Sequence, residues 1–142
     1  MSLTTPVSKM KVLRTLDSLP ARDRADVVVI GAGGAGMATA LFAALGGRRV
    51  LLVERTAHVG GTTALSAGTT WIPGTRLGAT VNPDDSLAEA ARFLDAAVGE
   101  RTAPGLRQGV LDNGAAAVEA RAARTEVRFR AVPRHPDYLS EL

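Results

Sequence analysis

Six residues near the start of the chain, Gly31-Ala32-Gly33-Gly34-Ala35-Gly36, constrain its fold more than any other stretch. An apolar run, 27–30, leads into this glycine turn, and a run of small residues, 34–45, leaves it. Glycine at the first, third and sixth positions allows a tight exit from a strand, close approach to the backbone, and close packing of a helix on a sheet. The pattern predicts a strand over 27–30 and a helix over 34–45.

A second apolar run, Val50 to Val53, ends at Glu54. Gly46 and Gly47 would end the preceding helix, and a right-handed crossover would place this second strand parallel to the first. Such a unit, with an acid about twenty residues after the glycine turn, is typical of a dinucleotide site. Gly33 would then let a pyrophosphate approach the backbone, and the helix N-terminus would face it with N–H groups and its positive dipole end. Glu54 would accept hydrogen bonds from the adenosine ribose and repel a 2′-phosphate, which disfavours NADP.

A membrane span is the first alternative for this region. Val27 to Gly47 contains 21 residues without a charge, which is long enough to cross a bilayer. Six of them are glycine, four within the glycine turn, which weakens a lipid-facing helix, and a second buried-strand pattern follows at once. We therefore expect no transmembrane segment.

Composition narrows the class of protein further. With 142 residues, 46% hydrophobic and 22% charged, the chain fits one soluble globular domain at most. The net charge of +3 comes from scattered arginines without interleaved aromatic residues, so we expect no nucleic-acid surface. The lack of cysteine excludes disulfides and thiolate metal sites, and His58 and His135 have no metal-ligand spacing, so no metal site is expected. Residues 1–25 read as a flexible lead-in without a secretory signal, which predicts a cytoplasmic location.

The stretch from Arg55 to Trp71 contains a second pair of glycines, Gly60 and Gly61. This pair supplies another close-approach turn, which can hold more phosphate or the ribityl and ring end of a flavin. A glycine- and threonine-rich loop without a ligand is the alternative. The hydroxyl residues beside the pair are Thr62, Thr63 and Ser66.

Between Trp71 and Gly99, the sequence pattern predicts turns and a helix that serve packing, and no residues with a role in catalysis or binding. Pro73 and Gly74 mark a turn, and 75–81 reads as irregular. A helix is expected after Pro83, ending at Gly99. Its candidate caps are Asp84, Asp85 and the capping-box pair Ser86 and Glu89. Its apolar stripe consists of Leu87, Ala91, Leu94 and Val98.

The C-terminal third is less regular. A weaker helix is expected from Pro104 to about Gly114, because Asp112-Asn113-Gly114 favours a stop. Residues 115–124 are helical by propensity, with few large apolar side chains. The alternation over 126–131 predicts a half-exposed strand.

From Asp26 to Thr63 the chain resembles, position by position, the N-terminal FAD-binding motif of many two-dinucleotide flavoproteins. The continuation GGTTALSAGTTWIPGT is similar to the fumarate reductase/succinate dehydrogenase flavoproteins, in particular the 3-ketosteroid Δ1-dehydrogenase-like proteins. The segment PDDSLAEAARFLDAAVG and a later PDY extend the likeness. The matching positions of the motif are Gly31, Gly33, Gly36, Ala40, Gly47, Val50, Glu54, Arg55, Gly60 and Gly61.

The resemblance implies an α/β fold, a Rossmann-like FAD-binding βαβ unit with following helices. Residues 26–142 would be the N-terminal portion of the FAD-binding domain, an incomplete domain without the substrate domain and the C-terminal flavin-contacting segment. An apolar sheet edge would then stay open.

The resemblance also implies cofactor contacts for particular positions. Ala35 and Gly36 would line the pyrophosphate, and the other cofactor-binding positions of the same turn are Gly31, Gly33 and Gly34. Glu54 would bind the adenosine ribose, with Arg55 beside it. Those at the diphosphate and ribityl chain are Gly61, Thr62 and Thr63, and those beneath the isoalloxazine are Ser66, Ala67 and Gly68. No histidine or arginine can be matched to an acid or base of the family, and Tyr138 is either a substrate-facing residue or a packing or surface tyrosine.

The function implied is that of an FAD-dependent oxidoreductase that dehydrogenates or reduces a carbon–carbon bond next to a carbonyl, on a steroid-like substrate. A fumarate reductase-like or tricarballylate dehydrogenase-like enzyme acting on small carboxylates is the alternative. Outside the enzymes, the chain could be a non-catalytic dinucleotide-binding module that needs a partner chain, or an inactive gene fragment. By itself it is expected to bind FAD weakly and to show no turnover.

Overall fold

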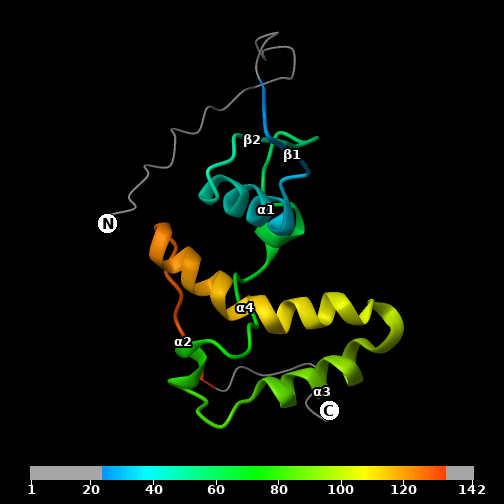
Figure 1. Ribbon diagram of the computed structural model, residues 1–142, viewed down its shortest axis with the longest axis vertical. Coiled ribbons are helices and arrows are strands. Elements are labelled where there is room, and N and C mark those ends of the chain that lie inside the picture. The colour runs from blue at the N-terminus through cyan, green and yellow to red at the C-terminus, as the bar shows by residue number, and fades with distance from the viewer. Residues whose placement is uncertain (1–23, 134–142) are drawn as a thin grey trace. The chain divides into compact units, whose positions relative to one another are not determined.

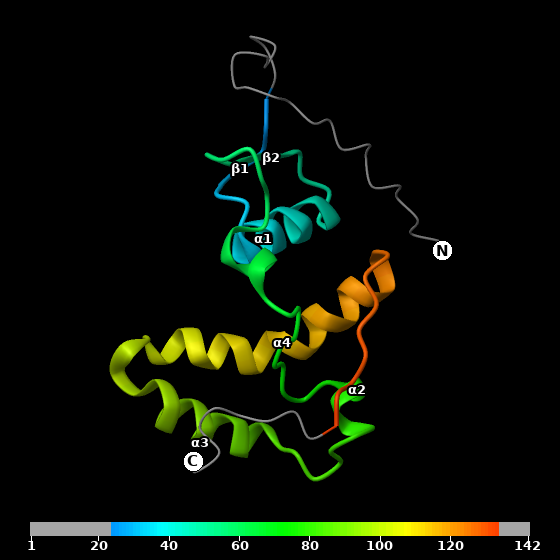
Figure 2. The same ribbon diagram turned by 180° about the vertical axis from the view of Figure 1, so that it is seen from behind.

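The computed structural model describes residues 24–133, which fall into two units divided between Thr69 and Thr70 (Figures 1 and 2). Most of the predicted lead-in, together with His135 and Tyr138, lies outside the described residues. The elements of the first unit are β1 (Val27–Ile30), α1 (Gly34–Leu45), β2 (Val50–Val53) and the 3-10 helix η2 (Gly61–Leu65). Those of the second are α2 (Arg76–Ala79), α3 (Leu87–Val98), the 3-10 helix η3 (Gly99–Arg101) and α4 (Pro104–Arg124).

The first unit is the predicted βαβ arrangement, with the predicted bounds. β1 and β2 pair in parallel, from Val27 opposite Val50 to Ile30 opposite Val53. Asp26 fixes this register at the start of β1, because its N–H donates to the carbonyl of Arg49 and its Oδ2 accepts from the N–H of Arg49, each at 2.8 Å. The two parallel strands therefore begin from one doubly hydrogen-bonded pair.

The two faces of this sheet differ in their cover. Val29 is buried, 8% exposed, on the face against which α1 packs. Val28 and Ile30 point to the opposite face and are 56% and 86% exposed. A strand apolar on both faces predicts helices on both sides, and that prediction is wrong for these residues. Among residues 24–133 the sheet has two strands, so each strand keeps one unpaired edge, as expected.

In the second unit, the helix expected after Pro83 is present as α3, but its cap is Ser86 rather than Asp84 or Asp85. The Ser86 Oγ accepts from the N–H of Glu89 at 3.2 Å, which is the N-cap half of a capping box, and its hydroxyl donates to the Glu89 carboxylate at 3.4 Å. The stretch 75–81, expected to be irregular, contains the single helical turn α2.

α4 runs without a break through the predicted stop at Asp112-Asn113-Gly114. The Asn113 side chain donates to the carbonyl of Gly109 at 2.9 Å, so it is satisfied along the helix. A Cβ at Gly114 would lie 2.9 Å from the Cγ2 of Ile72, so this glycine admits the isoleucine against the helix. Tertiary packing thus overrides the local stop signal.

The segment 126–131 shows the predicted alternation without forming a strand. Val127, Phe129 and Ala131 are partly buried, and Arg128 and Arg130 are exposed. Phe129 lies beneath the guanidinium of Arg121, 5.6 Å from its ring centre. No strand among the described residues pairs with the segment, so the strand prediction is wrong there.

The uncharged run 27–47 is divided between β1, the glycine turn and α1. Within residues 24–133, no helix combines the length and apolar character that crossing a membrane requires.

The close packing of α1 on the glycine turn gives a stability prediction. A Cβ at Gly36 would overlap the carbonyl oxygen of Gly31. We expect Gly36→Ala to lower the free energy of unfolding by about 3 kcal/mol, because overpacking at backbone atoms cannot relax through a side chain. Thermal melting followed by circular dichroism measures the change.

Gly109→Ala in α4 is the matched control. Nothing lies within 4 Å of the Cβ that this substitution adds, so it should raise the free energy of unfolding by about 0.5–1 kcal/mol through helix propensity. If the two variants melted alike, the packing assigned to Gly36 would be wrong.

Candidate functional site

The two glycine turns predicted from the sequence lie against each other. The N–H of Gly60 donates to the carbonyl of Ala32 at 2.7 Å, and Gly33 and Gly60 form an isolated parallel bridge. A Cβ at Gly61 would lie 3.2 Å from the Cα of Gly33. Backbone therefore packs on backbone at the ends of the strands, where ligands of parallel α/β sheets bind.

The second turn has a conformation that favours glycine. Gly60 and Gly61 have φ values of +114° and +54°. A Cβ at Gly60 would also lie 2.5 Å from the Cβ of Ala64. Both positions are therefore restricted by backbone conformation and by space.

Gly33, at the start of α1, faces open space. Its φ of −73° and ψ of 179° suit any residue, yet beyond its two chain neighbours none of the residues that the structure describes has an atom within 4 Å of the Cβ position. Among residues 24–133, no side chain caps α1, and no acidic residue lies in its first turn, so the N-terminal N–H groups have no side-chain acceptor in that part of the chain. Thr63 reaches this helix start, because a Cβ at Gly34 would lie 2.7 Å from its Oγ1. The arrangement suits an anion that approaches the helix N-terminus.

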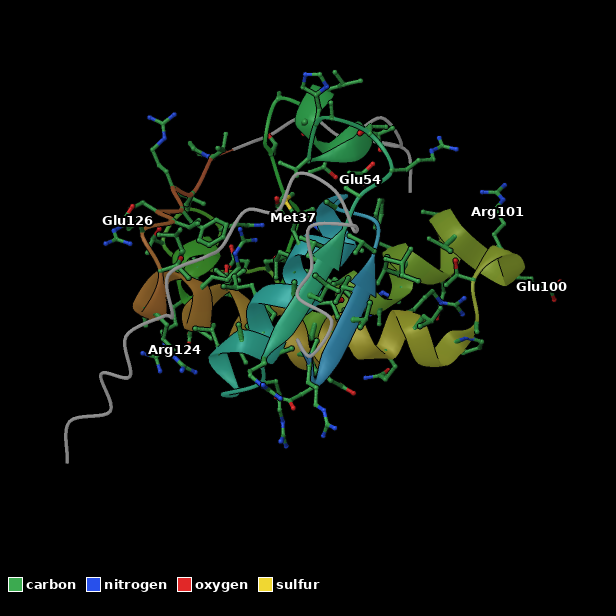
Figure 3. All side chains as sticks on the ribbon, turned by 90° about the horizontal axis from the view of Figure 1, so that it is seen from above. Met37, Glu54, Glu100, Arg101, Arg124 and Glu126 are labelled. Carbon is green, nitrogen blue, oxygen red and sulfur yellow. The ribbon has the colours of Figure 1, made fainter. Side chains whose placement is uncertain are left out.

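Glu54 follows β2 and its carboxylate turns to the first glycine turn (Figure 3). Its Oε2 accepts from the N–H of Ala32 at 2.8 Å, and its Oε1 accepts from the N–H and the hydroxyl of Thr56 at 2.9 and 3.0 Å. The Ala32 N–H, followed by the two Thr56 donors, lowers the pKa of Glu54 to about 2. Near neutral pH the group is an ionised, oriented acceptor.

The structure brings together part of the predicted set. Gly33, Gly34, Gly61, Thr63 and Glu54 all belong to the two turns or contact them. Gly31 has a φ of +95°, which glycine adopts readily and which turns the chain out of β1. Gly36 packs on Gly31, and Ala35 lies exposed in the first turn of α1.

The other predicted residues are exposed. Arg55 directly follows Glu54, and Thr62 lies in η2. Ser66 donates to the carbonyl of Thr63 at 2.8 Å and accepts from the N–H of Gly68 at 3.2 Å, so these hydrogen bonds are local. Ala67 lies between them, also exposed. The segment thus continues directly from the second turn, with its polar atoms accessible.

Two residues that orient Glu54 were not among the predicted set. Ala32 contributes through its backbone, which no sequence pattern reports. Thr56 carries a usable signal, since threonine side chains commonly hydrogen-bond to neighbouring groups in turns.

Comparison with known proteins gives a family match over the residues just described. Residues 26–137 match the model of a protein family described as FAD binding domain. The match therefore runs from the start of β1 through all of the elements above.

Two curated relatives match over 82% of the chain. The 4-oxocyclohex-2-ene-1-carboxylate 5-dehydrogenase of Sinomonas cyclohexanicum is 39% identical over 118 residues, and the 3-oxosteroid 1-dehydrogenase of Mycobacterium tuberculosis is 36% identical over 116 residues. The matched lengths are 20% and 21% of those enzymes. The chain thus spans about a fifth of the length of these relatives.

A solved structure also matches most of this chain with about a fifth of its own length. The 3-ketosteroid Δ1-dehydrogenase from Sterolibacterium denitrificans, in complex with 1,4-androstadiene-3,17-dione, superposes with a TM-score of 0.70 at 32% identity. The superposition covers 83% of this chain and 21% of that one.

The anchored carboxylate gives a pH prediction. Because the pKa of Glu54 falls from 4.5 to about 2 on folding, its ionised form stabilises the fold above about pH 4.5, and this contribution is lost as the pH falls through about 2. We expect the melting temperature to drop between about pH 5 and about pH 2, and to drop less in Glu54→Gln.

Part of the acid sensitivity should persist in that variant. The N–H of Arg49, foremost among several contacts, also lowers the pKa of Asp26. An acid profile in Glu54→Gln equal to that of the unmodified chain would show that Glu54 is not anchored as described.

Proposed function

Because the chain belongs to the family of FAD-binding domains, we propose that residues 26–142 form the N-terminal, cofactor-holding portion of a flavin-dependent dehydrogenase or reductase. Its reaction would be on a carbon–carbon bond adjacent to a carbonyl. FAD is the cofactor of the family. The observation that carries the proposal is the contact between the two glycine turns, with open space next to Gly33 and the carboxylate of Glu54 held by Ala32.

The residues present fit the ADP half of FAD. The space next to Gly33 would take the diphosphate, with the N-terminus of α1 supplying N–H donors and Thr63 a hydroxyl. Glu54 would accept hydrogen bonds from the adenosine ribose, with Arg55 beside it. The remaining pyrophosphate-lining positions would be Gly31, Gly34, Ala35 and Gly36, and Gly61 and Thr62 would continue along the diphosphate.

Bound FAD would supply the redox chemistry, because its ring can take up a hydride, that is two electrons with one proton, from the substrate. For the flavin end we propose Ser66, Ala67 and Gly68. Gly68 has a φ of +79° and nothing lies within 4 Å of its Cβ position, so its backbone can be approached closely. An exposed, side-chain-poor segment suits contact with a flat ring.

For the substrate we propose a ring ketone, steroid-like in its broad class. The two curated relatives are named as dehydrogenases of oxo-substituted ring compounds, and their similarity continues well past the glycine turns. A small carboxylate is the second candidate, because the name of the Sinomonas relative includes a carboxylate. We assign no catalytic acid or base to this chain, and expect no turnover from it alone.

Gly33→Ala separates binding from folding. The added methyl group has room and an ordinary backbone conformation, so the melting temperature should stay unchanged. It would occupy the space proposed for the diphosphate, so affinity for FAD should fall at least about tenfold, or about 1.4 kcal/mol. Quenching of flavin fluorescence by the purified full chain measures the dissociation constant.

Gly105→Ala is the matched control, since it also adds a methyl group with nothing within 4 Å and should leave affinity unchanged. ADP should compete with FAD, whereas FMN, which lacks the adenosine half, should not. A folded chain that binds no FAD would contradict the proposal for a stand-alone site and favour a module that needs a partner chain. A chain that is insoluble with and without FAD would favour an inactive fragment.

A further inference from the structure

Thr56 makes two hydrogen bonds to the carboxylate of Glu54, and no part of the glycine-turn motif predicts them. Its N–H and its hydroxyl both reach Oε1, at 2.9 and 3.0 Å. The other oxygen, Oε2, is held by the N–H of Ala32. The carboxylate is therefore fixed at both oxygens, by the first glycine turn on one side and by Thr56 on the other.

The hydroxyl of Thr56 has one proton and two acceptors within reach. Besides Glu54 Oε1 it lies 2.7 Å from the carbonyl oxygen of His58. A hydroxyl rotates to suit its partners, so the proton can point to either oxygen. The hydroxyl therefore lies between the carboxylate of Glu54 and the backbone of His58.

The carboxylate keeps room for a ligand while Thr56 holds it. A carboxylate offers about four lone-pair sites, and three donors reach Glu54. One site is therefore open to a ribose hydroxyl while the hydroxyl of Thr56 stays at Oε1.

We propose that Thr56 is a positioning residue for dinucleotide binding, which holds the Glu54 carboxylate in the orientation that receives the ribose. It acts through Glu54 and does not itself contact the cofactor. Because this role presupposes the proposed binding of a ribose at Glu54, the test needs one readout that does not depend on FAD.

The decisive variants are Thr56→Val and Thr56→Ser in the full chain. Valine keeps the shape and the backbone N–H but loses the hydroxyl, whereas serine keeps the hydroxyl. The first readout is the pKa of Glu54, measured without FAD from the pH dependence of its carboxyl carbon resonance. The second is the dissociation constant for FAD. Thr80→Val, which removes a hydroxyl donating to Leu77 in α2, is the control.

We expect Thr56→Val to raise the pKa of Glu54, because one donor to the ionised form is lost, and to weaken FAD binding about threefold to tenfold. Thr56→Ser should restore both values, and Thr80→Val should change neither. An unchanged pKa in Thr56→Val, an unchanged affinity beside a raised pKa, or no restoration by serine would each overturn the role of Thr56. If the unmodified chain bound no FAD, the proposed function of this chain would fail, and the pKa comparison would still decide whether Thr56 holds Glu54.

Discussion

The structure of the first unit depends on the contact between two glycine turns. One buried residue, Ala32, connects them: its carbonyl accepts from Gly60, and its N–H donates to Glu54. The side chain of Ala32 is completely inaccessible, so the peptide groups on either side have little freedom to find other partners. The hydrogen bonds of the Ala32 backbone therefore hold both the second turn and the carboxylate of Glu54 against the first turn.

This dependence explains why the site contains so few polar side chains. Donors come from backbone N–H groups, at the uncapped start of α1 and at Ala32 and Thr56. Backbone donors are fixed by the fold, so they require no ordering of long side chains when a ligand binds. Glycine is then needed where two backbones, or a backbone and a ligand, approach within the space of a side chain.

The sequence predicted the βαβ unit closely because its signals are local: apolar runs of strand length, a glycine turn and an acid at a fixed distance. It failed where distant residues decide. α4 continues through Gly114 because Ile72 packs there, and Val127 and Phe129 alternate as a strand would but have no partner strand among residues 24–133. At the site, spacing identified the glycines and Glu54, whereas the role of the Ala32 backbone depends on a contact that only the folded chain reveals.

Little apolar surface is removed from water in the part of the chain that the structure describes. The buried hydrophobic residues are Val29, Ala32, Ala90 and Leu111, while Val28, Ile30 and Leu65 are largely exposed. The heat-capacity change of unfolding and its dependence on denaturant both scale with the surface that unfolding exposes. Both should therefore be small for a chain of this length, giving a shallow stability curve and a broad, weakly cooperative denaturant transition.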